Sequence, residues 1–162
     1  MSTPGQIGRV EAIHVARQRA RPMVAVGSVE ALAGRGLAGD RYERREGTYS
    51  KGRIQAGRQL TLIAAEALHA MAAESGLPLS AAESRRNVLT RGITLEGLVG
   101  KRFRIGAVLC FGEARCPPCG HLERLTRPGV VDALGDRGGL RADILEGGTI
   151  RVGDEVALAA DR

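Results

Sequence analysis

Residues 101–123 read Lys-Arg-Phe-Arg-Ile-Gly-Ala-Val-Leu-Cys-Phe-Gly-Glu-Ala-Arg-Cys-Pro-Pro-Cys-Gly-His-Leu-Glu. The first eleven residues predict two strands joined at Gly106. The second strand leads into Cys116-Pro117-Pro118-Cys119, where each proline fixes its own φ and lacks a main-chain N–H. We therefore expect the two thiols on a stiff, non-helical bend, with His121 two residues further on.

Similar short strand signals recur on both sides of this stretch. The expected strands cover residues 8–15, 23–26, 59–63, 142–145, 149–152 and 155–158, with a hairpin turn at 146–148. The one long helix is expected at 64–75, ended by Gly76 and Pro78. Ser80-Ala81-Ala82-Glu83 spells a capping box for a short helix, and another short helix is expected at 128–134. Residues 1–162 are thus expected to form a single, mostly β domain, a β-barrel with a few short helices.

Composition limits the classes of function. The chain has 24 Lys and Arg against 18 Asp and Glu, and all but two of these cations are arginines. Arginine suits phosphate and carboxylate groups, so an anionic ligand is plausible, although a solvated arginine-rich surface explains the charge equally well. Aromatic residues make up only 2% of the chain, which argues against binding of single-stranded nucleic acid.

The sequence also bears on location. No apolar run reaches the ~18 residues of a membrane span. The first five residues lack the charged and apolar regions of a signal peptide. The three cysteines, an odd number, argue against a disulfide framework. We therefore expect a cytoplasmic protein with reduced thiols and no membrane association.

Two loops combine glycine with arginine, at residues 34–41 and 135–141. The first is not a dinucleotide-binding fingerprint, because it is followed by a polar, charged segment rather than by a helix. That segment, residues 42–58, is predicted to be a long surface loop, and long loops in compact domains are commonly functional.

Three arginines and an amide surround the strand expected near residues 85–91. In an extended strand Arg85 and Asn87 would share one face and Arg86 the other. Arginine beside asparagine can hold an anionic ligand rich in heteroatoms. A sheet edge guarded by charge is the other interpretation.

The thiols allow three interpretations. A structural zinc site would need four ligands, for which Cys110, Cys116, Cys119 and His121 could be counted. A thioredoxin-like dithiol has the right spacing but belongs before a helix in a βαβ unit. A single thiolate acting as nucleophile or soft metal ligand would be favoured by neighbouring arginines such as Arg115.

Seven segments in order resemble the MOSC domain, named for the C-terminal part of molybdenum cofactor sulfurases. They are Gly-Leu-Ala-Gly-Asp-Arg (36–41), Gln-Leu-Thr-Leu-Ile (59–63), Arg-Arg-Asn-Val-Leu-Thr-Arg-Gly (85–92), Gly-Lys-Arg-Phe-Arg-Ile-Gly (100–106), Cys-Pro-Pro-Cys-Gly-His-Leu (116–122), Arg-Gly-Gly-Leu-Arg-Ala (137–142) and Gly-Thr-Ile-Arg-Val-Gly-Asp (148–154). The resemblance covers nearly the whole chain.

The resemblance implies a β-barrel-like domain that binds molybdenum cofactor. It selects Cys119 over Cys116 as the thiolate that ligates molybdenum, a soft ligand suited to such a metal. It further implies that the cofactor is held by Arg85, Arg86, Asn87, Asp40 and Arg41. Larger members, such as the mitochondrial amidoxime-reducing components, carry an extra N-terminal domain that contributes to the cofactor site. Without such a domain, cofactor binding is expected either to be weaker or to use the 42–58 loop instead.

The resulting hypothesis is a molybdenum-dependent reductase of N-hydroxylated small molecules, with Cys119 as metal ligand and His121 as a proton source. No flavin, haem or iron–sulfur motif is recognisable, so a separate reductase is the expected electron donor. The alternative is a sulfur carrier that receives sulfur from a sulfur donor protein, holds it as a persulfide on Cys119 and delivers it to a cofactor or another protein. A nucleic-acid-binding domain is a third hypothesis, suggested only by the charge of +6.

Overall fold

In a computed structural model of the chain, which describes residues 5–18, 20–41, 43 and 57–160, most of the regular structure is β. The loop predicted at 42–58 falls outside these residues except at positions 43, 57 and 58. Of the helices in the described ranges, none combines the length and apolar character needed to cross a lipid bilayer.

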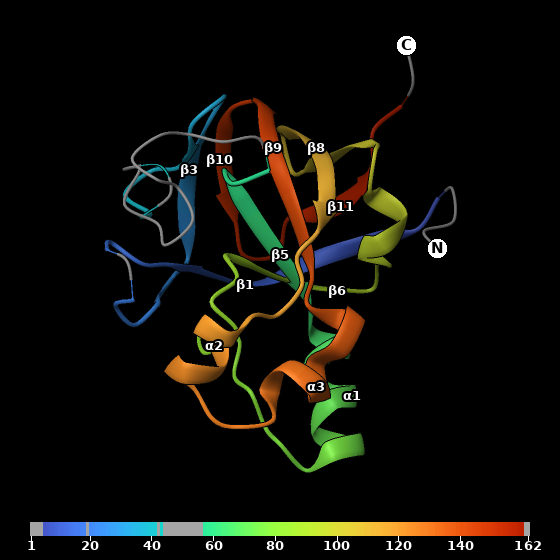
Figure 1. The fold of residues 1–162 in the computed structure, drawn as a ribbon. Helices are drawn as coiled ribbons and strands as arrows, with labels where there is room; N and C mark the ends of the chain where they lie inside the picture. Colours follow the sequence, from blue (N-terminus) through green and yellow to red (C-terminus); the bar gives the residue numbers. More distant parts are fainter. Residues whose placement is uncertain (1–4, 19, 42, 44–56, 161–162) are drawn as a thin grey trace.

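Seven of the described strands close a barrel (Figure 1). Around the barrel they follow the order β1 (Ile7–Val15), β11 (Glu155–Leu158), β7 (Arg102–Ile105), β8 (Val108–Arg115), β9 (Leu140–Glu146), β5 (Leu60–Ala64) and β6 (Val88–Arg91). The last of these pairs again with β1. Neighbouring strands are antiparallel except β5 and β6, which are parallel. The expectation of a mostly β, barrel-like fold is confirmed, as is the strand pair joined at Gly106.

The parallel pair requires a crossover connection. It is provided by α1 (Ala65–Ser75), which follows β5 directly and ends at Gly76, whose φ of 72° is left-handed. The helix predicted at 64–75 is therefore confirmed, with Leu68 and Met71 on its buried face. The exposed histidine of this helix, His69, faces away from that core.

The barrel interior is filled by aliphatic side chains and one aromatic ring, that of Phe103. Val10 and Ile13 of β1 are both buried although they are an odd number of positions, three, apart, because the pairing of β1 with β6 shifts register between Val10 and Ala12. A β-bulge of this kind moves later side chains to the opposite face. Cys110 lies in the same core and is fully buried.

A small second sheet lies beside the barrel. It consists of β10 (Gly148–Arg151), β3 (Ser28–Leu32) and β4 (Gly36–Leu37) in that order, while β2 (Val24–Val26) pairs with the end of β1. The predicted hairpin of 142–145 with 149–152 is wrong, because β10 pairs with β3 and not with β9. After the turn at 146–148 the chain leaves the barrel and enters the second sheet, instead of folding back to pair with β9.

The helices gather at one end of the barrel (Figure 1). Alongside α1 lie α2 (Gly120–Leu125) and α3 (Val130–Leu134). The described part of the chain also contains two 3₁₀ turns, η1 (Leu95–Leu98) between β6 and β7, and η2 (Gly135–Arg137) directly after α3. A second apolar cluster joins these helices to the outer face of β5 through Ile63, Met71, Leu122, Val130 and Leu134. This cluster supports the segment that carries Cys119, which packs against it.

The short helix predicted from the capping box is wrong. The capping box at 80–83 does form, since Ser80 N–H donates to Glu83 Oε1 (3.0 Å) and Glu83 N–H to Ser80 Oγ (3.1 Å). The chain makes only a turn there, because Arg85 adopts a left-handed φ of 63° that a helix cannot continue. The cysteine bend is non-helical as predicted, since residues 116–119 lie outside any helix and Cys119, the N-cap residue of α2, has an extended backbone.

Candidate functional site

A pocket of about 270 Å³ opens where the cysteine segment meets the turn before β6. We call it the arginine–thiol pocket. Five arginines and two cysteines dominate its lining, which holds no carboxylate among the described residues. The lining residues are Arg41, Arg58, Thr61, Arg85, Arg86, Cys116, Pro117, Cys119 and Arg141. The pocket therefore combines strong positive charge with soft sulfur ligands.

Arg86 holds the cysteine segment in place. Its Nη2 donates to the carbonyl oxygens of Cys116 (3.1 Å) and Pro117 (3.3 Å), and its Nε donates to that of Gly138 (2.8 Å). Charge-assisted bonds of this kind are stronger than neutral ones. Arg86 thus joins three segments that are far apart in the sequence, and it acts on the thiols through the main chain.

Two glycines let the chain pass close behind the cysteine segment. A Cβ on Gly138 would lie 2.2 Å from the carbonyl oxygen of Cys116 and 2.8 Å from Pro118 Cδ. Gly139 has a φ of 109°, and a Cβ there would lie 2.0 Å from Leu62 O. The main chains also bond directly, with Cys116 N–H donating to Gly139 O (2.8 Å). The glycine-rich loop predicted at 135–141 therefore forms the back wall of the site.

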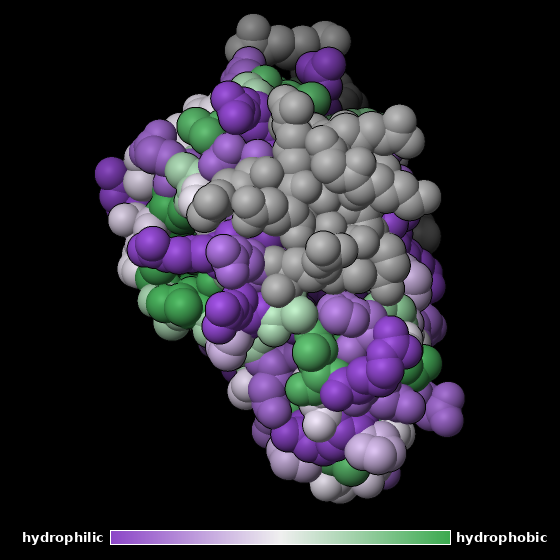
Figure 2. Space-filling view, turned by 60° about the vertical axis from the view of Figure 1, so that its left-hand side comes forward, coloured by the Kyte–Doolittle hydropathy of each residue, from purple (hydrophilic) through white to green (hydrophobic). Residues whose placement is uncertain are grey.

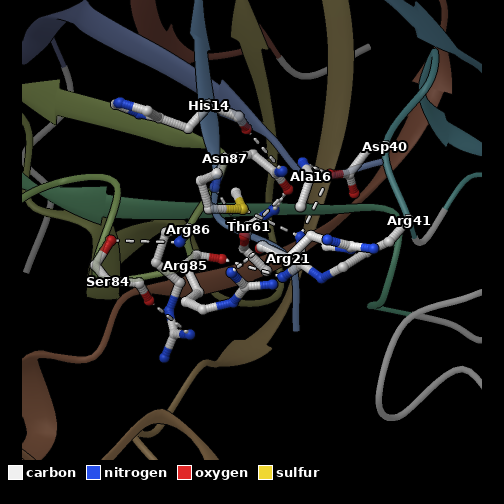
Figure 3. A network of polar contacts seen from close by, with 11 residues as sticks. His14, Ala16, Arg21, Asp40, Arg41, Thr61, Ser84, Arg85, Arg86 and Asn87 are labelled. Atoms are coloured by element: carbon white, nitrogen blue, oxygen red, sulfur yellow. Dashed lines mark hydrogen bonds and ion pairs between the residues drawn. The ribbon is translucent and has the colours of Figure 1, made fainter. Parts of the chain in front are cut away.

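Arg41 and Arg85 lie side by side at the opposite edge (Figure 3). Arg41 is buried and its guanidinium contacts Asp40 Oδ1 (3.3 Å) and the carbonyl oxygen of Arg85 (3.3 Å). Asp40 is fully buried, accepts a hydrogen bond from Ala16 N–H (2.9 Å), and does not line the pocket. Asp40 therefore orients Arg41, and only the arginine reaches the cavity.

Asn87 lies behind the pocket, within the barrel wall. Its Oδ1 accepts hydrogen bonds from Thr61 N–H and Thr61 Oγ1 (both 3.1 Å), and its Nδ2 donates to His14 O (3.1 Å). Its side chain is 1% exposed and joins β5 to β1 (Figure 3). The prediction that Arg85 and Asn87 share a strand face is wrong, because β6 begins only at Val88 and Arg85 lies in the preceding turn.

Arg141 has an unsatisfied donor. It lies on β9, lines the pocket, and its Nε is buried without a hydrogen-bond partner. A buried donor without a partner is costly, so such a group is expected to meet a ligand or water. The composition did not distinguish this arginine from the others, although the Gly-Gly-Leu-Arg segment at 138–141, which ends with it, could have indicated it.

The three thiols differ in environment. Burial in the barrel raises the pKa of Cys110 to about 12, with a further contribution from Asp143, so this thiol is unreactive at neutral pH. Cys116 and Cys119 both line the pocket, the first buried and the second half-buried. Among the described residues, no three His, Cys, Asp or Glu side chains gather as a metal site. The four ligands counted for structural zinc are therefore not brought together.

The structure brings together some of the predicted site residues and separates others. Arg41, Arg85, Arg86 and Cys119 line one cavity. His121 lies in the first turn of α2, half-buried, outside the lining residues, so its role as proton source stays a prediction. Sequence reasoning missed Arg141, Thr61 and Arg58, the last of which ends the loop named as a substitute contributor.

Comparisons with known proteins agree on one family. The family model of the MOSC domain matches residues 12–157. A solved structure of the YuaD protein from Bacillus subtilis is similar over 100% of both chains, with a TM-score of 0.79 and 16% sequence identity. No sequence match was found among the curated proteins.

Two further structures share the fold. YiiM from Geobacillus stearothermophilus has a TM-score of 0.67 and 15% identity, over 94% of this chain and 75% of that one. YiiM from Escherichia coli has a TM-score of 0.66 and 18% identity, over 95% and 71%. At such low identity these structures establish the fold alone.

Proposed function

Because the chain belongs to the MOSC domain family, which is associated with the molybdenum cofactor, we propose that it binds this cofactor in the arginine–thiol pocket and reduces N-hydroxylated compounds. The reaction converts R–NHOH, two electrons and two protons into R–NH₂ and water. The electrons come from a separate reductase. The observation that carries the proposal is the joint presence of five arginines and two thiols around one cavity, with no carboxylate among the lining residues that the structure describes.

The residues present fit the chemistry of the cofactor. Its phosphate and heteroatom-edged pterin are suited to guanidinium groups, which donate in a planar fork. The buried, unpartnered Nε of Arg141 is a donor ready for such an acceptor. Molybdenum accepts soft thiolate ligands, and neither pocket cysteine is part of a disulfide bond. When bound, the cofactor supplies the two-electron redox centre.

Within this pocket the chain's residues have distinct tasks. Arg41, Arg85 and Arg141 bind the anionic part of the cofactor, and Cys119, the more exposed pocket thiol, ligates the metal. Arg86 keeps the cysteine segment in position. His121, two residues beyond Cys119, is proposed as the proton source for the oxygen that leaves as water.

The test is the cofactor content of the protein after expression in a host that makes molybdenum cofactor. We expect molybdenum and pterin to copurify with the wild type, and the content to fall in Arg141→Gln, which removes the unpartnered guanidinium. An exposed arginine on the neighbouring strand, Arg115, offers the matched control Arg115→Gln. Wild-type protein without molybdenum and pterin would refute the proposal.

A sulfur carrier is the second candidate, and the presence of Cys116 beside Cys119 favours it. A second thiol in the same pocket can attack a persulfide on Cys119 and release the outer sulfur as hydrogen sulfide, leaving a disulfide between the two cysteines. Mass spectrometry after incubation with a sulfur donor would detect an increment of one sulfur on Cys119 in protein that contains no molybdenum. Absence of both that adduct and the Cys116–Cys119 disulfide would exclude this candidate.

A further inference from the structure

A second pocket, of about 220 Å³, lies next to the arginine–thiol pocket. We call it the apolar pocket because hydrocarbon side chains supply most of its lining. Its lining residues are Ala20, Pro22, Met23, Ala82, Glu83, Arg85, Leu125 and Thr126. Neither the family match nor the related structures assign it a role.

Arg85 is common to both pockets. Both its main chain and its side chain are hydrogen-bonded. Its main-chain N–H donates to Ala82 O (3.1 Å), and its carbonyl oxygen accepts from Arg41 Nη2 (3.3 Å). Its guanidinium donates to the carbonyl oxygen of Arg21. Its left-handed φ of 63° is rare for a residue with a side chain. The fold therefore maintains a strained residue at the point where the two pockets meet.

A second contact links the pockets. Met23, which lines the apolar pocket, accepts a hydrogen bond on its sulfur from Nη1 of Arg41 (3.4 Å), which lines the arginine–thiol pocket. Figure 3 shows Arg41 and Arg85 close to one another, with Arg21 beside them. The two pockets therefore adjoin at Arg85, and a ligand that spanned them would have its polar group on one side of this residue and an apolar group on the other.

The lining of the apolar pocket suits an uncharged group. Its one carboxylate, that of Glu83, is already bound by Arg127 and by Ser80 N–H (3.0 Å), which lower its pKa and keep it ionised in those contacts. Leu125, the largest aliphatic side chain of the lining, is 40% exposed. Figure 2 shows hydrophobic surface among hydrophilic side chains in the helical part of the molecule.

The volume of the apolar pocket limits the size of the group that it can bind. An apolar cavity of about 150 Å³ binds benzene, so a pocket of about 220 Å³ accommodates one six-membered ring with a short link. A guanidinium also stacks favourably on an aromatic face, and Arg85 is placed for such a contact. An aromatic ring is thus preferred over a chain of equal size.

We propose that the apolar pocket binds the aromatic body of the substrate, whose N-hydroxy group lies across Arg85 in the arginine–thiol pocket. This inference rests on the proposed reductase function and names its substrate class: N-hydroxylated amines that carry one uncharged aromatic ring. Leu125 and Ala82 are then specificity-determining residues.

The test compares N-benzylhydroxylamine with N-methylhydroxylamine by NMR titration of the protein without added cofactor. We expect the benzyl compound to bind at least about tenfold more tightly, as even one methylene in an apolar pocket contributes about 10–200-fold. Leu125→Asp should abolish this preference. Leu145→Asp, at a leucine of similar exposure on β9, is the matched control and should retain it. Ala82→Leu, which fills the pocket without adding charge, should also abolish it.

Equal affinity of the two compounds, or equal effects of Leu125→Asp and Leu145→Asp in folded protein, would overturn the assignment. A second measurement separates this failure from failure of the proposed function. If cofactor-loaded protein reduces both compounds with one KM that Leu125→Asp and Ala82→Leu leave unchanged, the reductase stands and the pocket assignment is overturned. If the benzyl preference is present in binding but neither compound is reduced, the pocket assignment is supported and the reductase fails.

Discussion

Nη2 of Arg86 lies 3.1 Å from the carbonyl oxygen of Cys116 and donates a hydrogen bond to it. The residue that the sequence offered as a cofactor ligand therefore has several of its donors engaged within the protein, with Gly138 and Pro117 as further acceptors. The arginine-rich turn and the cysteine segment are thereby joined directly. Changes at this joint should affect the thiols as well as the stability of the fold.

Arg86→Lys tests this joint. Lysine keeps the charge but cannot place donors on three separated carbonyl groups. We expect the free energy of unfolding to fall by roughly 1.5–3 kcal/mol, the contribution of a hydrogen bond to a charged group. Cys116, which is buried in the wild type, should also react faster with an alkylating reagent. Denaturant unfolding and timed mass spectrometry measure the two effects.

The matched control is Arg115→Lys, at an exposed arginine that immediately precedes Cys116. It should change neither stability nor alkylation. If Arg86→Lys behaved like this control, Arg86 would not position the cysteine segment.

Gly138→Ala should be strongly disruptive. The added Cβ would overlap the carbonyl oxygen of Cys116, and the main chain would have to shift. Overpacking of this kind costs roughly 1–3 kcal/mol. Gly27→Ala is the control, since a Cβ there meets nothing within 4 Å. A Gly138→Ala protein with the unfolding midpoint of Gly27→Ala would show that the close approach is not needed.

Cys119→Ala and Cys116→Ala should separate the two pocket thiols. Since changes merely beside a metal ligand already cost about 10–100-fold in affinity, loss of Cys119 should lower molybdenum per chain at least about tenfold. Cys116→Ala should retain most of the metal. Elemental analysis of both variants measures this, and the opposite order would assign the ligand role to Cys116.

Asn87→Asp tests whether the amide supports the fold. Aspartate matches the shape of asparagine but cannot donate to His14 O, and its charge would be buried in the barrel wall. We expect a loss of stability of roughly 1–3 kcal/mol or more, measured in protein free of cofactor. If Asn87→Asp were as stable as the wild type and only cofactor binding fell, the amide would act on the cofactor.

Stability should depend on the ionisation of His14. Burial lowers the pKa of this histidine, whose Nδ1 has no hydrogen-bond partner. Between the ordinary pKa of 6.5 and the lowered value, the unfolded chain binds a proton that the folded chain does not, so stability is lost as pH falls through this window. Below the folded pKa this loss does not grow further.

The measurement is the free energy of unfolding against pH for wild type, His14→Gln and His69→Gln. His69 is exposed on α1 and serves as the control. The slope just below pH 6.5 should weaken in His14→Gln and persist in His69→Gln. Equal slopes in the first variant and the wild type would exclude His14 as the source.

Much of the barrel was predictable because the residue pattern within each segment is enough to indicate a strand. The alternation in residues 8–15 and the two strands around Gly106 were enough to place β1, β7 and β8. The pairing of β10 with β3 was not predictable, since a glycine turn at 146–148 is compatible with a hairpin or with departure from the sheet. Long-range burial decides between them.

The candidate site was predictable in its members more than in its geometry. Arginine, asparagine and cysteine were read as one ligand-binding set, yet Asn87 belongs to the barrel wall and Arg86 to the support of the cysteine segment. The cause is the left-handed backbone conformation of Arg85. Such a conformation is uncommon for residues other than glycine, so the identity of this residue did not predict it. One such residue changes the direction of the side chains next to it.

The barrel is closed by β1 and β11, with Ile7 opposite Ala157. These partners are 150 residues apart, so a chain leaving the ribosome has almost all of its length outside before the seam can form. Contacts between residues so far apart in the sequence form slowly during folding. We therefore expect molecular chaperones to meet this protein as an open sheet, and any prosthetic group to be inserted after synthesis and not during it.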